Sequence, residues 1–302
     1  MPFTEDLIQL CEKHHCEYKT DESLKLHTTF KIGGSCKIAV FVNSEDSIRE
    51  MITYCRNNNV KFAVIGNGSN IIAEDKPFDG AVFILSSAFS KILNVKDGVV
   101  ECESGLMLSS LCVFMLNEGL TGLEFAYGIP GTVGGALYMN AGAYGGEMSD
   151  VVLSADYLDT DGSVKTIMKE NMDLSYRHSA FMHSGRIILR VRVKLKKGSA
   201  AEIKQKMDTL MDKRREKQPL NFPSAGSTFK RPEGAFAAAL IEQCGLKGYS
   251  VGDAQVSEKH SGFVINKGNA TFDDLMELVD VVKEKVKTDT GYDLELEPEI
   301  LR

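Results

Sequence analysis

Glycine is concentrated in one stretch, GLEFAYGIPGTVGGALYMNAGAYGG, which runs from Gly122 to Gly146 and holds eight of the chain's 27 glycines. This density is far above the average of about 7 % for glycine in proteins. A second glycine-rich stretch, VIGNGSNII, spans residues 64–72. Glycine permits positive φ angles and close approach of the backbone to a ligand. Two such loops beside β-rich segments favour a backbone cradle for a phosphate-bearing cofactor over the alternative, simple turns between strands.

The first glycine loop does not have the dinucleotide-binding pattern GxGxxG. A buried-type strand over residues 61–65 leads into Gly66-Asn67-Gly68-Ser69-Asn70, but strand-like Ile71-Ile72 follows instead of a helix. The fingerprint needs a helix N-terminus to hold the pyrophosphate. The sequence therefore excludes a doubly wound nucleotide fold and predicts that backbone N–H groups and the side chains of the loop are the donors.

Bulk composition indicates an ordinary globular protein and does not exclude a local basic pocket for an anionic small molecule. Apolar residues make up 43 % and charged residues 25 % of the 302 positions, which are ordinary globular values. A net charge of −7 argues against non-specific nucleic-acid binding, which needs a basic face. The start, MPFTEDLIQL, lacks a signal-peptide pattern, and no apolar run approaches the roughly 18–20 residues that span a bilayer. We expect a cytoplasmic protein without membrane insertion, and its oligomeric state stays open.

The cysteines and histidines predict no metal site. The seven cysteines are scattered without a CxxC pair, so neither a zinc site nor a redox dithiol is indicated. Cys55 and Cys112 fall at apolar positions of expected helices, where a thiol behaves as a small buried hydrophobe.

Local patterns predict an α+β fold with a β-rich larger part before about residue 200 and a smaller α/β part after it. A helix is expected over 4–16, other helices are expected to begin at Ser44, Ser199 and Thr271, and one is expected to end at Gly119. These expectations rest on apolar spacing and capping residues. Strands are expected over 27–42 (interrupted by a turn at Gly33-Gly34), 61–65, 81–103, 186–195 and 255–266, with hairpin turns at Asp97-Gly98 and Asp161-Gly162.

Three polar clusters are candidates for chemistry: Arg177 in SYRHSAF, Ser227 in AGSTFKRP, and the glutamates Glu297 and Glu299 in LEPEI. Taken singly, each has an ordinary alternative as a surface arginine, a turn serine or a solvated terminal carboxylate. No G-x-S-x-G elbow is present, which disfavours a hydrolase serine. The residues alone therefore predict a phosphate-cofactor protein whose second part accepts anions.

Taken together, the motifs resemble the family of UDP-N-acetylenolpyruvoylglucosamine reductases, flavoenzymes that complete UDP-N-acetylmuramate in bacterial peptidoglycan synthesis. The resemblance rests on HTTFKIGG, VIGNGSNII, GLEFAYGIPGTVGGALYMNAGAYGGE, YRHSAF, AGSTFKRP, GLKGYSVGDAQVSEKHSGFVIN and LEPEI, which follow in family order over about residues 27–300. The chain resembles the shorter subtype, which lacks an extra loop in its last domain.

The resemblance implies an FAD-binding domain of the vanillyl-alcohol-oxidase type followed by a smaller α/β substrate-binding domain. The implied borders are 1–60 and 61–200 for two FAD-binding subdomains and 201–302 for the substrate-binding domain. FAD is bound non-covalently, and NADPH is the hydride donor. The cofactor-binding residues implied by the family motifs are Ile65, Gly66, Asn67, Gly68, Ser69, Asn70, Gly128, Ile129, Pro130, Gly131, Thr132, Gly134, Gly135, Asn140 and Gly142.

The implied reaction reduces the enolpyruvyl group of the substrate. Ser227 is expected to donate the proton, and Arg177 with a terminal glutamate is expected to stabilise the enolate, since developing negative charge needs a fixed cation and hydrogen-bond donors. The local motif selects Glu299, whereas the usual interval from Ser227 favours Glu297; we choose Glu299. Tyr144, Lys230, Arg231 and His260 are the expected substrate-binding residues.

Two alternatives from other classes remain open at this point. The first is a different FAD oxidoreductase of the same architecture, acting on an alcohol or amine with oxygen as acceptor. The second is a non-catalytic nucleotide-binding module.

Overall fold

The computed structural model describes residues 3–85 and 87–302, which divide into two compact units. Unit 1 comprises the described residues up to Thr20, Ile38–Asn67 and those of Gly80–Lys213. Unit 2 comprises Asp21–Lys37, Gly68–Asp79 and Arg214–Arg302. Two segments from the first third of the chain therefore belong with its last third. The three predicted domains stay a prediction, because a division by contacts does not identify what each part binds.

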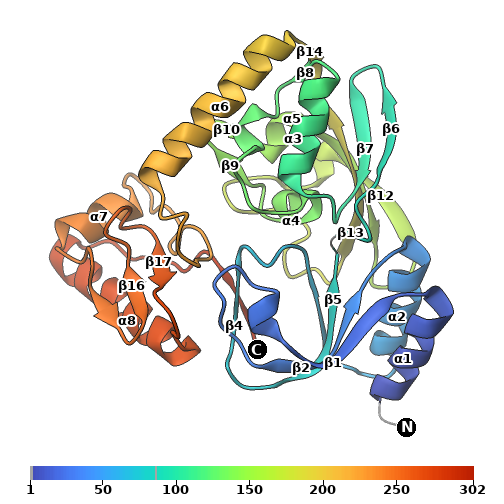
Figure 1. The fold of residues 1–302 in the computed structure, drawn as a ribbon, viewed down its shortest axis with the longest axis horizontal. Helices are drawn as coiled ribbons and strands as arrows, with labels where there is room; N and C mark the ends of the chain where they lie inside the picture. The colour runs from blue at the N-terminus through green and yellow to red at the C-terminus, as the bar shows by residue number, and fades with distance from the viewer. Residues whose placement is uncertain (1–2, 86) are drawn as a thin grey trace. The chain divides into compact units, whose positions relative to one another are not determined.

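The largest sheet of unit 1 is antiparallel and has five strands. Its order is β12 (Val164–Met168), β11 (Val152–Leu158), β13 (Ile187–Lys194), β7 (Val99–Glu103) and β6 (Ile92–Lys96). The predicted hairpin turn between β6 and β7 is confirmed: Asp97 and Gly98 have φ of 52° and 76°, as the favoured two-residue hairpin turn requires. Three helices accompany this sheet (Figure 1): α3 (Leu108–Asn117), α4 (Val133–Tyr138) and α5 (Met148–Val151). One apolar core, which includes Val191, Leu111 and Leu137, joins the sheet to these helices.

A second sheet has the order β1-β2-β5-β3. Its strands are β1 (Glu17–Ser23), β2 (Ser35–Phe41), β5 (Phe78–Ile84) and β3 (Phe62–Ile65), and β3 runs parallel to β5. Helices α1 (Phe3–His14) and α2 (Glu45–Asn57) lie side by side (Figure 1). The predicted start of α2 is confirmed, since Ser44 forms a capping box with Ser47. The predicted apolar positions Ile48, Met51, Ile52 and Cys55 are fully buried.

The strand expected over 27–42 is wrong in its first half. Only β2, from Ser35, is extended there, and a short 3₁₀ helix η1 (Leu24–Leu26) precedes residues 27–34, which form turns. Lys31 has a φ of 63°, which no regular strand contains, whereas the φ of 126° at Gly33 fits the turn predicted at Gly33-Gly34. The Gly34 N–H donates to the Glu74 carbonyl instead of to a neighbouring long strand.

Unit 2 contains a small sheet and two helices (Figure 1). The sheet is β15 (Ser250–Val251), β16 (Ala254–Val256) and β17 (Val264–Asn266), and the helices are α7 (Ala237–Gln243) and α8 (Phe272–Thr290). The predicted capping box of Thr271 and Asp274 starts α8, and the helix ends at Gly291 in the left-handed conformation. The strand expected over 255–266 is wrong in its middle, because Ser257 Oγ accepts the N–H groups of Lys259 and His260 and folds a turn there.

The remaining elements are short or connect the two units. A parallel pair, β4 (Ile71–Ala73) with β18 (Glu299–Leu301), belongs to unit 2. The long helix α6 (Ala200–Lys217) ends before Pro219, as predicted, and its residues from Arg214 belong to unit 2. The other elements are β8 (Leu120–Thr121), β9 (Gly142–Ala143), β10 (Gly146–Glu147), β14 (Lys196–Lys197), η2 (Glu124–Ala126) and η3 (Lys169–Asn171).

The cysteines are buried and form no disulfide bonds, as the sequence predicts for Cys55 and Cys112. Burial raises the pKa of Cys55 and of Cys102 to about 12, so these thiols stay protonated and pack as small hydrophobes. Among the helices of the described residues, none combines the length and the apolar character that crossing a membrane requires.

Candidate functional site

The two glycine-rich loops touch each other within unit 1. The side-chain amide of Asn67 donates to the carbonyl oxygen of Pro130 at 2.6 Å. A Cβ atom added to Gly66 would lie 2.4 Å from Thr132 Oγ1, closer than any side chain tolerates. Glycine is therefore required at position 66 by the approach of the second loop, and the sequence prediction that the loops act as a pair has a structural basis.

The first loop presents backbone donors, and strand β4 follows it instead of a helix. Within the described residues, the backbone N–H groups of Gly66–Asn70 donate no hydrogen bond to the protein. Buried or half-buried N–H groups need an acceptor, and successive loop N–H groups are suited to phosphate oxygens. The exclusion of a doubly wound nucleotide fold is consistent with the observed strand-loop-strand order.

The second loop is fixed by the segment that follows β7. The N–H of Gly134 donates to Ser104 O at 2.8 Å, and the N–H of Leu108 donates to Gly131 O at 2.9 Å. A Cβ on Gly134 would lie 2.6 Å from the Cβ of Ser104. Thr132 caps α4 by accepting the Gly135 N–H at 3.2 Å. Residues 128–135 are thus held rigidly, as a binding loop requires.

Arg177 lies at the tip of a tight turn in unit 1. Ser175 and His178 exchange two backbone hydrogen bonds of 3.3 and 3.1 Å, which leaves Tyr176 and Arg177 between them. Arg177 has a φ of 54°, and its guanidinium lies 5.2 Å from the centre of the half-exposed Tyr176 ring. Tyr144 also lies at a tip, that of the β9–β10 hairpin, where it is 44 % exposed.

Ser227 belongs to unit 2 and lies in a segment that is hydrogen-bonded to two of the predicted motifs. The next residue, Thr228, is buried; its N–H donates to Gly262 O, and its carbonyl accepts the N–H of Glu297 at 2.9 Å. The N–H of Lys230 donates to Glu295 O at 2.9 Å. The half-buried Ser227 is therefore brought close to the LEPEI motif and to the turn that carries His260.

The terminal glutamates are held by the first glycine loop. In β18, Glu299 pairs with Ile71 of β4, and its N–H donates to Asn70 O at 2.9 Å. The side-chain amide of Asn70 donates to Glu297 O at 3.4 Å. Glu297 is 8 % exposed and Glu299 is half-buried. The choice between them stays a prediction, since both lie on the segment that Asn70 fixes.

The three remaining predicted substrate residues lie in unit 2. The Gly262 N–H donates to His260 Nδ1 at 3.2 Å, so the neutral ring carries its proton on Nε2, and burial lowers the pKa of His260. Lys230 Nζ lies 3.4 Å from Glu295 Oε2. The Arg231 guanidinium stacks 4.7 Å from the centre of the exposed Phe236 ring. Lys230 and Arg231 carry positive charge and His260 carries an Nε2–H donor, which are the kinds of group that suit an anion.

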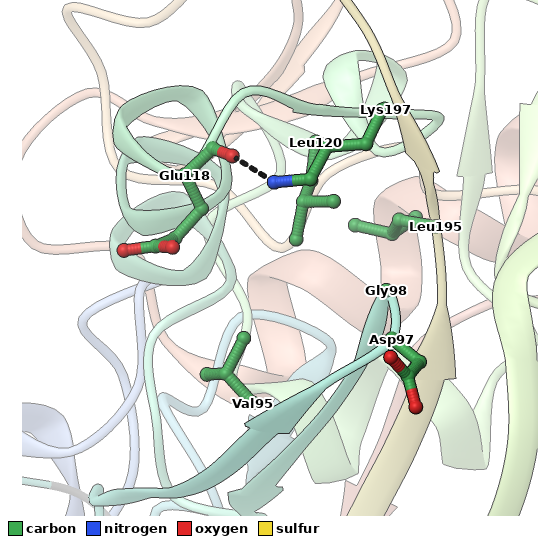
Figure 2. Close-up of a pocket in the computed structure, with 7 residues that line it drawn as sticks. All are labelled: Val95, Asp97, Gly98, Glu118, Leu120, Leu195 and Lys197. Atoms are coloured by element: carbon green, nitrogen blue, oxygen red, sulfur yellow. Dashed lines mark hydrogen bonds between the residues drawn. The ribbon is translucent and has the colours of Figure 1, made fainter.

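A pocket of about 390 Å³ in unit 1 is separate from these residues. Figure 2 shows its lining, in which Lys197 Nζ donates to the Glu118 carbonyl at 3.1 Å. It lies between the β6–β7 hairpin, the end of α3 and the β8–β14 pair, and its lining residues are Val95, Asp97, Gly98, Glu118, Leu120, Leu195 and Lys197. Of the predicted site residues, all of which the structure describes, none lines this pocket.

Two contacts of the site were missed by the sequence reasoning. A Cβ atom added to Gly68 would lie only 1.9 Å from His27 O, and the N–H of Thr29 donates to Gly68 O at 3.2 Å. The HTTFKIGG segment therefore shapes the first loop. Asn140 reaches the Arg177 turn, since its amide donates to Ser175 O at 3.0 Å. The glycine at 68 was the available signal for the first contact, whereas no local pattern indicates the second.

Comparison with family models gives two matches. The model described as "UDP-N-acetylenolpyruvoylglucosamine reductase, C-terminal domain" matches residues 218–301. The model described as "FAD binding domain" matches residues 36–168.

Curated relatives match over nearly the whole chain. A UDP-N-acetylenolpyruvoylglucosamine reductase of Clostridium novyi is 47 % identical over 287 residues, covering 94 % of this chain and 92 % of that protein. A protein of the same name from Caldanaerobacter subterraneus is 46 % identical, with coverage of 93 % and 91 %.

Solved structures agree. The crystal structure of UDP-N-acetylenolpyruvylglucosamine reductase from Thermus caldophilus is similar with a TM-score of 0.79 at 34 % identity, covering 95 % of this chain and 99 % of that one. An alkyldihydroxyacetonephosphate synthase shares the fold alone, with a TM-score of 0.50 at 16 % identity over 64 % of this chain and 40 % of that one. The predicted fold class, α+β with an FAD-binding domain and a smaller C-terminal domain, is confirmed.

Proposed function

The chain belongs to the family of UDP-N-acetylenolpyruvoylglucosamine reductases, and from this premise we propose that it reduces the enolpyruvyl group of UDP-N-acetylglucosamine enolpyruvate with NADPH as the hydride donor. As a family member with an FAD-binding domain it is a flavin-dependent oxidoreductase of peptidoglycan synthesis. The roles of its individual residues, the use of NADPH and the identity of the substrate are the content of the proposal.

Residues 65–70 and 128–135, with Gly142, are proposed to hold FAD. The donor set fits the group: the N–H groups of Gly66–Asn70 do not donate to the described protein, and a diphosphate supplies the acceptors they need. The contact of Gly66 with Thr132 and the bond from Asn67 to Pro130 keep the two loops together. When bound, FAD supplies hydride chemistry, accepting a hydride from NADPH and passing it to the substrate.

Arg177 and Glu299 are proposed to stabilise the enolate that forms next to the substrate carboxylate, and Ser227 is proposed to donate a proton to the neighbouring carbon. A fixed guanidinium lowers the energy of developing negative charge. A serine hydroxyl is a weak acid, so it serves only when a strongly basic enolate is held in close geometry. The backbone bonds of Thr228 to Gly262 and Glu297 support such a fixed position for Ser227.

Lys230, Arg231, His260 and Tyr144 are proposed to bind the anionic substrate or NADPH. Lys and Arg supply charge for phosphates, and His260 supplies an Nε2–H donor because its Nδ1 accepts from Gly262. Tyr144, exposed at a hairpin tip, is available to stack on a ligand.

The observation that carries the proposal is the attachment of the LEPEI motif both to the first glycine loop, through Asn70, and to the Ser227 segment, through Thr228. A cofactor loop and the proposed catalytic residues of unit 2 thereby share one hydrogen-bonded framework. A nucleotide-binding module needs no such connection.

The test is an anaerobic visible spectrum of the purified holoprotein. NADPH should bleach the flavin absorption, and UDP-N-acetylglucosamine enolpyruvate should restore it. Oxygen restoring the colour rapidly while the enolpyruvyl compound has no effect would contradict the proposal and indicate an oxidase. A protein that cannot be reconstituted with FAD would contradict the cofactor role of the loops.

A further inference from the structure

The side chain of Asn140 links the end of the glycine-rich segment to the Arg177 turn. Its Nδ2 donates to Ser175 O at 3.0 Å, and its Oδ1 accepts the N–H of Ser149 at 2.9 Å. The residue is 1 % exposed. The orientation of the amide follows from its partners, because a flipped amide would oppose an NH₂ group to the Ser149 N–H. Only a side chain with a donor and an acceptor at this distance satisfies both groups.

The turn that Asn140 contacts has no regular structure to fix it. Between η3 and β13 the described chain forms neither helix nor strand, apart from the single bridge between Ser175 and His178. Arg177 has a φ of 54°, a conformation that a non-glycine residue keeps only when its surroundings impose it. The turn therefore depends on hydrogen bonds with residues from outside it.

Those anchors come from the end of α4. Besides Asn140, the carbonyl of Tyr138 accepts the hydroxyl of the fully buried Ser179 at 2.7 Å. The other end of α4 begins at Thr132, which lies against Gly66. A helix of six residues is about 9 Å long, so one short rigid element joins the first glycine loop to the Arg177 turn within unit 1.

We propose that Asn140 is a positioning residue for Arg177, holding the 175–178 turn so that the guanidinium meets the enolate, and that it is not a direct FAD ligand. The inference rests on the proposed function of Arg177. It replaces the cofactor role expected for Asn140 from the motif, because the buried amide uses its oxygen and one of its hydrogens on the protein's own backbone. If the side chain at position 140 cannot donate, the Ser175 carbonyl loses its hydrogen bond, and the turn is free to shift.

The test compares Asn140→Asp with the matched variant Asn171→Asp, which makes the same change at an exposed position in the same unit. The aspartate keeps the size of the side chain and an acceptor for Ser149 but sets a carboxylate against Ser175 O. We expect FAD affinity, the flavin spectrum and flavin reduction by NADPH to match the wild type. Reoxidation by the enolpyruvyl substrate should slow by about 10- to 100-fold, as small displacements of a positioned group cause. Hydrogen exchange should rise in the peptide that contains residues 173–181, and Asn171→Asp should change none of these readouts.

Lower pH should partly rescue Asn140→Asp. A protonated carboxyl again offers an O–H donor to Ser175 O and an acceptor to the Ser149 N–H. The charged groups on the segments packed against position 140 are Glu147 and Asp150 beside Ser149, and Asp173, Arg177 and His178 beside Ser175. All are present in both proteins, so the ratio of variant to wild-type reoxidation rates isolates position 140. This ratio should rise as the pH falls.

Several outcomes would overturn the inference. Weaker FAD binding, or equal slowing of both half-reactions, assigns Asn140 to the cofactor site or to general folding. Unchanged reoxidation, or a ratio that does not respond to pH, removes the positioning role. Arg177→Lys distinguishes this failure from failure of the proposed function: if that variant is reoxidised as fast as the wild type, the role of Arg177 is wrong, whatever Asn140→Asp does.

Discussion

Glu299 donates its backbone N–H to the carbonyl of Asn70 at 2.9 Å, although the two residues lie far apart in the sequence. The bond continues the parallel pairing of β18 with β4. It fixes the last motif of the chain to the first glycine loop. A catalytic role for the terminal glutamate and a cofactor role for residues 68–70 are thus compatible with one framework in unit 2.

Replacing Ser227 by alanine should separate the two half-reactions. The hydroxyl is the proposed proton donor to the substrate carbon, whereas NADPH oxidation needs no such donor. Anaerobic stopped-flow absorption should show normal flavin bleaching and reoxidation slower by about 10²- to 10⁴-fold, the range for loss of a general acid. Ser250→Ala, at an exposed strand position, is the control and should leave both phases unchanged. Equal loss in both phases would disprove the proton-donor role.

The glutamine variants of Glu299 and Glu297 form a matched pair. We expect Glu299→Gln to slow reoxidation by about 10²-fold through weaker electrostatic stabilisation, with flavin reduction unchanged. Glu297→Gln should have a smaller effect on the same step. The reverse order, measured in the same stopped-flow experiment, would transfer the catalytic role to Glu297.

Adding a methyl group at Gly66 should disturb the contact between the two glycine loops. The new Cβ would lie 2.4 Å from Thr132 Oγ1, and overpacking of this kind costs about 1–3 kcal/mol. We expect Gly66→Ala to lower the melting temperature and to weaken FAD binding, measured by quenching of flavin fluorescence. On this background Thr132→Ala removes the clashing oxygen, so the double variant should lose less stability than the sum of the single variants. Simple additivity would show that the clash is absent.

Glu124 should contribute to stability in a pH-dependent way. The residue is 2 % exposed; burial acts to raise its pKa, but hydrogen bonds from Thr121, from backbone N–H groups including that of Gly122, and from Lys206 hold the pKa below its usual value. Because the folded-state pKa is lowered, the stabilisation is present above the unfolded value near 4.3 and is lost as the pH falls.

Glu124→Gln therefore should destabilise the protein by about 1–3 kcal/mol at pH 7, the cost of leaving buried donors without a charged acceptor. The difference between the variant and the wild type in free energy of unfolding, measured with urea, should become smaller at acid pH. A similar variant at the exposed Glu118 should have no such effect. A pH-independent difference would contradict the charge-based explanation.

Local elements were predictable where short-range rules decide them. The caps at Ser44 and Thr271, the apolar stripes of α2 and α8, and the Asp97-Gly98 hairpin depend on neighbours within a few residues. The strands expected over 27–42 and 255–266 failed in part, the first because a distant partner overrides β propensity there and the second because a local side chain folds a turn. Gly34 bonds to Glu74, and Ser257 reorganises the backbone before His260.

The sequence by itself predicted that two glycine loops serve a phosphate-bearing cofactor, and its motifs placed the chain in a family. Glycine density and motif order are properties of the sequence, so they can be recognised without knowledge of the fold. Only the tertiary structure decided that Gly66 touches Thr132, that Asn70 holds the LEPEI motif, and that Asn140 anchors the Arg177 turn. Each of these contacts joins residues distant in sequence, and the two hydrogen bonds end on backbone carbonyls that every residue possesses. Side-chain identity alone therefore could not reveal them.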